Sequence, residues 1–185
     1  GGGNFWQSSD ALDSGIERTA SDGMGMLSTI LNAVALQAAL EANDVETRVL
    51  SAIDVPQLAT QYVRRKAVNH LAEGRIVICA GGTGNPYFST DSAAALRALE
   101  LNCEVLLKAT TVDGVYNKDP KKHPDAVMYD TLSYEEALEK QLHVMDQAAF
   151  GLCAEPKLPI VVFRGGDLEL LRKAVRGERV GTRVS

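Results

Sequence analysis

The sequence predicts an α/β fold in which a mainly parallel central sheet lies between layers of helices. Segments with a helical pattern and segments with a strand pattern alternate along the chain, as they do in such folds. Strand-like runs such as "RIVICA" (75–80) are continuously apolar, which is typical of parallel strands covered on both faces. The 185 residues, 45% of them hydrophobic, suffice for one core. We therefore expect a three-layer α/β/α sandwich, with residues 1–185 forming a single domain.

The first half of the chain predicts two helices and two strands. Ser21 or Asp22 is a candidate N-cap for a long first helix, and Gly74 suits the C-terminal end of the second. Apolar residues cover much of the circumference of the first helix, so we expect it to be buried on two sides. In chain order the elements are a helix over 22–42, a strand over 47–53, a helix over 56–73 and a strand over 75–80.

The second half continues the alternation around one long loop. Ser133 and Glu136 have the spacing of a capping box, which marks the start of a helix. The last residues, "GTRVS", predict a strand at the edge of the sheet. The other elements are a helix over 91–102, a strand over 104–109, a loop over 110–126, helices over 133–141 and 146–155, a strand over 159–165 and a helix over 167–178.

Composition excludes several classes of function. The net charge is −5 with the charges well mixed, which disfavours sequence-independent binding of nucleic acid. Cys79, Cys103 and Cys153 lie far apart in apolar surroundings and lack zinc-ligand spacing, so we expect buried, reduced thiols in a cytoplasmic protein. Apolar runs all fall well short of about 18 residues, so no membrane span is expected.

Three loops rich in glycine and polar residues are expected at the carboxyl ends of strands, where α/β folds bind ligands. These are residues 1–9, 81–91 and 110–123. Glycines expose backbone N–H groups that can approach an anion, and a helix N-terminus favours phosphate. Tight turns, a simple N-cap at Thr90 or Asp91, and a solvated surface loop are the alternatives. Neither GxxxxGK[ST] nor GxGxxG is present, which excludes the ordinary P-loop and dinucleotide-binding motifs.

Four stretches together resemble the bacterial uridylate kinases of the amino acid kinase superfamily. They are "SDGMGMLSTILNAVAL" (21–36), "AGGTGNPYFSTDSAA" (80–94), "LLKATTVDGVYNKDP" (106–120) and "VMDQAAF" (144–150). The resemblance implies a carbamate kinase-like fold and the reaction ATP + UMP → ADP + UDP, with Mg²⁺, in pyrimidine nucleotide synthesis. It also implies a cytoplasmic homohexamer with GTP as activator and UTP as inhibitor. A nucleotide-binding relative with weak catalysis, or another amino acid kinase, remains the alternative.

The same resemblance implies roles for individual residues. Gly2 would contact UMP, Asp22 would hold its ribose hydroxyls, and Asp91 would organise catalytic lysines. No protein ligand to a metal is implied. The residues that would wrap uracil and the UMP phosphate are Thr83, Gly84, Asn85, Pro86, Tyr87, Phe88, Ser89 and Thr90. Those that would bind ATP are Gly3, Gln7, Thr110, Tyr116 and Asp119.

Two features depart from the family pattern. Gln7 stands where the family usually has an arginine, and an amide supplies neither a positive charge nor a guanidinium fork. The family's first strand and its glycine loop with a "KxSGE" lysine have no counterpart in this sequence. We therefore expect residues 1–185 to be an N-terminally incomplete kinase domain. The mechanism we expect is in-line transfer to an ionised UMP phosphate oxygen, for which no general base is needed.

Overall fold

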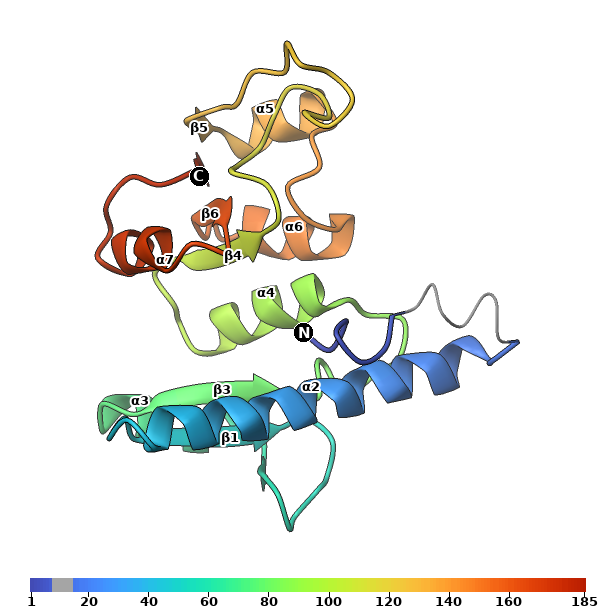
Figure 1. Ribbon diagram of the computed structural model, residues 1–185, viewed down its shortest axis with the longest axis vertical. Coiled ribbons are helices and arrows are strands. Elements are labelled where there is room, and N and C mark those ends of the chain that lie inside the picture. The colour runs from blue at the N-terminus through green and yellow to red at the C-terminus, as the bar shows by residue number, and fades with distance from the viewer. Residues whose placement is uncertain (8–14) are drawn as a thin grey trace. The chain divides into compact units, whose positions relative to one another are not determined.

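The computed structural model describes residues 1–7 and 15–185. Over these residues helices and strands alternate, which confirms the α/β class (Figure 1). Two compact units make up the chain, residues 1–93 and residues 94–185, and each contains its own sheet. The single domain expected from the sequence stays a prediction.

The first unit contains a three-stranded parallel sheet in the order β2-β1-β3. Strand β1 pairs with β3 along its whole length, from Thr47 opposite Ile76 to Ser51 opposite Ala80. Helix α2 packs against β1 and β3, and helix α3 packs against β3. The elements are α2 (Arg18–Glu41), β1 (Thr47–Ser51), β2 (Thr60–Gln61), α3 (Arg64–Ala72) and β3 (Ile76–Ala80).

Helix α2 differs from its prediction at its start and in its burial. It begins at Arg18 after Glu17, which makes no side-chain cap, so Ser21 and Asp22 lie inside the helix and do not cap it. Leu27 and Leu31 are both more than half exposed, so burial on two sides was wrong. The apolar residues that look continuous in the sequence are divided between a packed face and an open one.

Helix α2 also bears on the expectation that no segment spans a membrane. Among the described residues it is long and apolar enough to do so, judged by length and composition alone. This is weak evidence, because helices that pack in the cores of soluble proteins have the same properties.

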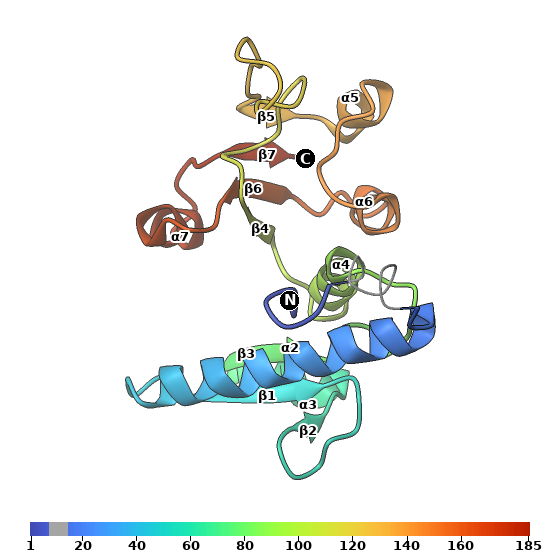
Figure 2. The ribbon, with the colours of Figure 1, turned by 45° about the vertical axis from the view of Figure 1, so that its right-hand side comes forward.

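The second unit contains a mixed four-stranded sheet in the order β4-β6-β7-β5. Figure 2 shows α7 on one face of this sheet and α5 and α6 on the other. Its strands are β4 (Leu106–Thr110), β5 (Thr131–Leu132), β6 (Ile160–Arg164) and β7 (Thr182–Val184). Its helices are α5 (Tyr134–Glu139), α6 (Gln147–Ala154) and α7 (Leu168–Val175), preceded by α4 (Thr90–Glu100), which begins in the first unit.

Strand β7 lies inside the sheet, so its prediction as an edge strand was wrong. It pairs antiparallel with β6 and parallel with β5. Thr182 is fully buried, and its hydroxyl accepts a hydrogen bond from Val115 N and donates one to Tyr129 O. These bonds explain how a threonine takes an interior position, since a buried hydroxyl needs partners. The two-residue strands β2 and β5 are too short to leave a period in the sequence.

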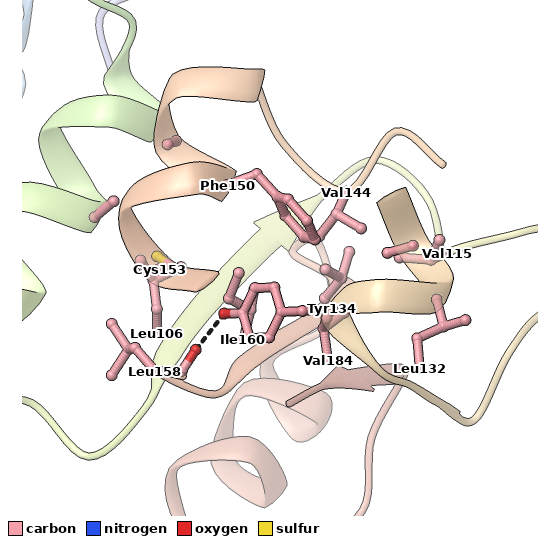
Figure 3. Packing of buried hydrophobic residues seen from close by; sticks show 14 of the residues in the cluster. Leu106, Val115, Leu132, Tyr134, Val144, Phe150, Cys153, Leu158, Ile160 and Val184 are labelled. Atoms are coloured by element: carbon pink, nitrogen blue, oxygen red, sulfur yellow. Dashed lines mark hydrogen bonds between the residues drawn. The ribbon is translucent and has the colours of Figure 1, made fainter. Parts of the chain in front are cut away.

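The core of the second unit is centred on two aromatic rings (Figure 3). Tyr134 and Phe150 pack with their ring centroids 5.0 Å apart, and the Tyr134 hydroxyl donates to Leu158 O. Burial raises the pKa of Tyr134 above its ordinary value. The expected capping box is confirmed, because the Ser133 Oγ accepts from Glu136 N and the Glu136 carboxylate accepts from Ser133 N.

The three cysteines do not share one environment. Cys153 is fully buried in the core of the second unit, and burial raises its thiol pKa. Cys79 is half-buried, whereas Cys103 is exposed, so the prediction that all three are buried was wrong for Cys103. That residue lies in the connection between the end of α4 and the start of β4.

Candidate nucleotide-binding cleft

A cleft of about 260 Å³ lies in the first unit. Three segments form it: residues 2–7, the first turns of α2, and the loop that leaves β3. Because β3 is a parallel strand, this loop occupies the carboxyl end of the sheet, where α/β proteins bind ligands. The lining residues are Gly2, Gly3, Trp6, Gln7, Ser21, Asp22, Gly25, Met26, Thr29, Gly82, Thr83, Asn85, Phe88, Ser89 and Thr90.

Gly2 is buried where the first segment crosses α2. A Cβ atom on Gly2 would lie 2.6 Å from Ser28 Cβ and 2.8 Å from the carbonyl oxygen of Gly25. Both distances are too short for real contacts, so only glycine lets the two backbones approach this closely. The Gly2 carbonyl accepts hydrogen bonds from Phe5 N and Trp6 N, which turns the segment back toward the cleft.

Two side chains fix the rest of this segment. The Trp6 indole Nε1 donates to Ser21 Oγ at 2.9 Å, and Ser21 is almost fully buried. Gln7 Nε2 donates to Gly3 O at 3.0 Å. Gln7 therefore lines the cleft as a neutral amide that donates a hydrogen bond within its own segment.

The loop after β3 is built on glycines in the left-handed region. Gly81, Gly82 and Gly84 have φ values of +76°, +60° and +81°, which side chains rarely adopt. Gly81 N donates to Thr29 Oγ1 at 2.8 Å, so the loop is tied to α2. Gly84 N donates to Gly81 O, which closes a turn. This loop therefore contains a tight turn and also contributes residues to the cleft lining.

Helix α4 receives its cap from Ser89, not from Thr90 or Asp91. Ser89 Oγ accepts from Ser92 N at 3.1 Å, and Ser89 O accepts from Ala93 N. Ser89 and Thr90 line the cleft, whereas Asp91 does not. The cleft therefore borders the N-terminal end of α4, where backbone dipoles favour an anion.

Asp22 joins α2 to the glycine loop. Its carboxylate accepts from Arg18 Nε, 2.9 Å from both oxygens, and from Tyr87 N at 2.8 Å. The Arg18 guanidinium carbon also lies 5.5 Å from the centre of the Tyr87 ring. Tyr87 itself has a φ of +71°, which is uncommon for a residue with a side chain.

Most of the residues expected to contact UMP line this cleft. They are Gly2, Asp22, Thr83, Asn85, Phe88, Ser89 and Thr90. Gly84, Pro86 and Tyr87 belong to the same loop but do not line it. Gly3 and Gln7, expected at ATP, line it as well. Their binding roles stay predictions.

Sequence reasoning missed the face of α2 that lines the cleft. The missed residues on this face are Ser21, Gly25, Met26 and Thr29, whereas Trp6 and Gly82 lie in the predicted loops 1–9 and 81–91. Asp22, Gly25, Met26 and Thr29 are spaced i, i+3, i+4 and i+7, which places them on one helical face. The sequence could have predicted this face, because Asp22 was already a candidate and the other three residues follow it at helical spacing.

The remaining expected ATP residues lie in the second unit. Thr110 ends β4, and its carbonyl accepts from Gly165 N at 2.8 Å. The Tyr116 hydroxyl donates to Asp113, and its pKa is raised by burial and then by the Asp113 charge. Asp113 is also ion-paired with Arg164 Nε at 2.6 Å. Tyr116 and its neighbours are thus part of an ordered, charged cluster.

Asp119 organises the loop that follows Tyr116. Its Oδ1 accepts from Lys121 N at 3.0 Å, and its carbonyl accepts from Lys122 N and His123 N. Asp119 therefore shapes a turn that presents two lysines, both exposed. The solvated-loop alternative for this segment fits these contacts as well as a nucleotide site does.

No group of three or more histidine, cysteine, aspartate or glutamate side chains is placed to hold a metal among residues 1–7 and 15–185. Mg²⁺ in kinases is held largely by substrate phosphates and water, with one or two carboxylates.

Several solved structures are similar to this chain. The UMP kinase of Bacillus anthracis is 38% identical, with a TM-score of 0.96, over 100% of this chain and 77% of that one. The UMP kinase of Ureaplasma parvum is 37% identical, with a TM-score of 0.95, over 100% and 79% of the two chains. The uridylate kinase of Archaeoglobus fulgidus is 32% identical, with a TM-score of 0.72, over 96% and 77%.

A family model gives the same result from the sequence. It describes the amino acid kinase family and matches residues 1–164. The glycine-lined cleft, the parallel sheet beneath it and these similarities lead to one conclusion: the chain belongs to the amino acid kinase family.

Proposed function

We propose that this protein is a UMP kinase, which transfers the γ-phosphoryl group of ATP to UMP. One observation carries the choice of acceptor: among the described residues that line the cleft, Asp22 is the only charged side chain. Hydroxyl and amide groups of Thr83, Asn85 and Thr90 match the neutral hydrogen-bonding edge of a pyrimidine. The named activities of the similar kinases agree with this choice.

The acceptor's phosphate is the part of UMP that needs positive potential. The N-terminal end of α4, which borders the cleft at Ser89 and Thr90, supplies it through the helix dipole. An acetylglutamate or aspartate acceptor carries two carboxylates and no base, so it needs more cationic side chains than the described lining supplies. This difference favours UMP over the other acceptors of the family.

The reaction follows from bringing two polyanions into line. The UMP phosphate oxygen is already ionised at neutral pH, so no residue has to remove a proton. Mg²⁺ bound to ATP would neutralise charge on the transferring group. The chain's own residues then bind and orient: Asp22 the ribose of UMP, Gly2 and residues 83–90 its base and phosphate, and Asp91 the lysines near the phosphoryl group.

For the donor, we propose that Gly3, Gln7, Thr110, Tyr116 and Asp119 bind ATP. We further propose a cytoplasmic homohexamer that GTP activates and UTP inhibits. The half-exposed leucines of α2 support a subunit contact along that helix. These proposals rest on the resemblance to the uridylate kinases.

The direct test is a coupled assay of ADP formation by the full-length protein. UMP, CMP, acetylglutamate and aspartate are compared as acceptors at equal concentration, with Mg²⁺ and ATP. We expect turnover with UMP to exceed that with each of the others. ADP formation that does not depend on UMP would reject the proposal, and UMP binding without turnover would favour a non-catalytic relative.

A further inference from the structure

Arg18, the first residue of α2, is the centre of a small cluster at the cleft. Its Nε lies 2.9 Å from both carboxylate oxygens of Asp22, and its guanidinium stacks on the Tyr87 ring at 5.5 Å. Tyr87 N donates to Asp22 Oδ2 at 2.8 Å. Residues from a helix and from a distant loop are therefore held by one arginine.

An ordinary surface ion pair does not account for this arrangement. The Asp22 side chain is only 11% exposed, although that of Arg18 is 54% exposed. A cation in the first turn opposes the helix dipole, and arginine four residues before aspartate is the weaker order for such a pair. Tyr87 is held at a positive φ, a conformation that is unfavourable for a residue with a side chain. Three unfavourable features meet at one carboxylate that lines the cleft.

Among residues 1–7 and 15–185, the donors to Asp22 do not use all of its acceptor capacity. An ionised carboxylate has about four acceptor sites, two on each oxygen. Arg18 Nε faces both oxygens, and Tyr87 N occupies a second site on Oδ2. Oδ1 therefore keeps one site for a donor, and Asp22 lines the cleft. A ribose hydroxyl is such a donor, and carboxylates commonly recognise the ribose 2′-hydroxyl in nucleotide sites.

We propose that Arg18 is a positioning residue for ribose recognition. It holds the Asp22 carboxylate so that Oδ1 accepts the 2′-hydroxyl of the acceptor, and the Tyr87 ring fixes the plane of the guanidinium. Arg18 thereby sets the preference for UMP over dUMP without contacting either nucleotide. The proposal rests on the proposed function and specifies how the same cleft discriminates between sugars.

The test compares UMP with dUMP in four full-length proteins: wild type, Arg18→Gln, Arg18→Lys and Arg48→Gln. Arg48 is the matched control, because it also pairs with an acid, Glu41, but lies on β1 outside the cleft lining. We expect Arg18→Gln to raise the KM for UMP about tenfold, the effect of one charge-assisted hydrogen bond. The KM for dUMP, the KM for ATP and kcat should stay near wild type.

Arg18→Lys should restore part of the discrimination, since it keeps the charge but loses the fork and the stacking. Arg48→Gln should behave as wild type. An unchanged ratio of UMP to dUMP in Arg18→Gln would overturn the proposal, and so would an equal rise in both KM values, which would indicate a general structural role.

Binding measurements distinguish failure of the proposed activity from failure of the proposed role of Arg18. A wild type that never turns over UMP rejects the proposed activity, and calorimetric Kd values for UMP and dUMP then decide the role of Arg18. Circular dichroism verifies folding, and if Arg18→Gln is unfolded, the Arg18→Lys ratio decides: a wild-type ratio overturns the proposal.

Discussion

The two units of the chain use their apolar residues differently. The second unit gathers them into one large buried cluster that includes Tyr134, Phe150 and Ile160. The buried cluster of the first unit is small and made of Ile30, Ala33, Val49 and Ala80. The first unit instead carries the cleft, with glycines at backbone contacts and polar side chains along its lining. One unit is therefore specified mainly by packing, and the other by backbone geometry and hydrogen bonds.

The largest expected effect contrasts the two cores. Ile160→Ala removes a fully buried side chain of β6 and should lower the free energy of unfolding by about 2–5 kcal/mol. Ile78 lies half-buried on β3, so Ile78→Ala should cost about 1 kcal/mol, in line with its smaller burial. Urea unfolding followed by circular dichroism measures both, and equal losses would contradict the contrast.

The next effect concerns backbone geometry in the first unit. Gly2→Ala places a Cβ 2.8 Å from the Gly25 carbonyl, so the first segment must move away from α2. We expect the free energy of unfolding to fall by about 1–3 kcal/mol and the affinity for UMP to become much weaker. Gly1→Ala is the control, because a Cβ atom added at Gly1 would have no other atom within 4 Å. Unaltered UMP affinity in Gly2→Ala would show that the close approach is unimportant.

A third prediction separates Asp22, assigned to UMP in the first unit, from Tyr116 and Asp119, assigned to ATP in the second. Asp22→Ala should weaken UMP binding about tenfold and ATP binding much less, since it removes a charged acceptor from the cleft. Tyr116→Ala or Asp119→Ala should do the reverse. Separate titrations of UMP and of a non-hydrolysable ATP analogue give the four affinities, and parallel losses of both ligands would refute the assignment.

The smallest effect is expected at the capping box of α5. Ser133→Ala removes the acceptor for Glu136 N and should lower the free energy of unfolding by about 1 kcal/mol, with UMP affinity unchanged.

The same capping box predicts a dependence of stability on pH. Lys140 and then the Ser133 backbone lower the pKa of Glu136 below its ordinary value. The contribution of Glu136 is therefore complete above that ordinary value and is lost as pH falls through the lowered pKa. The free energies of unfolding of wild type and Glu136→Gln should differ at neutral pH and become equal at acidic pH.

The fold was predictable wherever one element has a strong local pattern. The strands β1, β3, β4 and β6 and the capping box at Ser133 follow from apolar runs and a four-residue motif. The interior position of β7 in the sheet could not be predicted, because it depends on hydrogen bonds between Thr182 and residues more than fifty positions away. Local sequence carries no information on such partners.

The candidate site shows the same limit. The glycine loop was visible because glycine at positive φ is a local requirement. The cleft face of α2 and the Arg18–Asp22–Tyr87 cluster were not predicted, since they arise where a helix meets a loop 65 residues further along the chain. Pairing across that distance is a property of the folded chain.

Trp6 is the single tryptophan in the chain, and it lines the cleft with its indole bonded to Ser21. Its emission therefore reports on this one place, without background from other tryptophans. A nucleotide that binds beside the indole should change the polarity of the surroundings of Trp6 and thereby quench or shift its fluorescence. The protein thus carries an intrinsic optical sensor, with which acceptor binding can be followed in real time without a label.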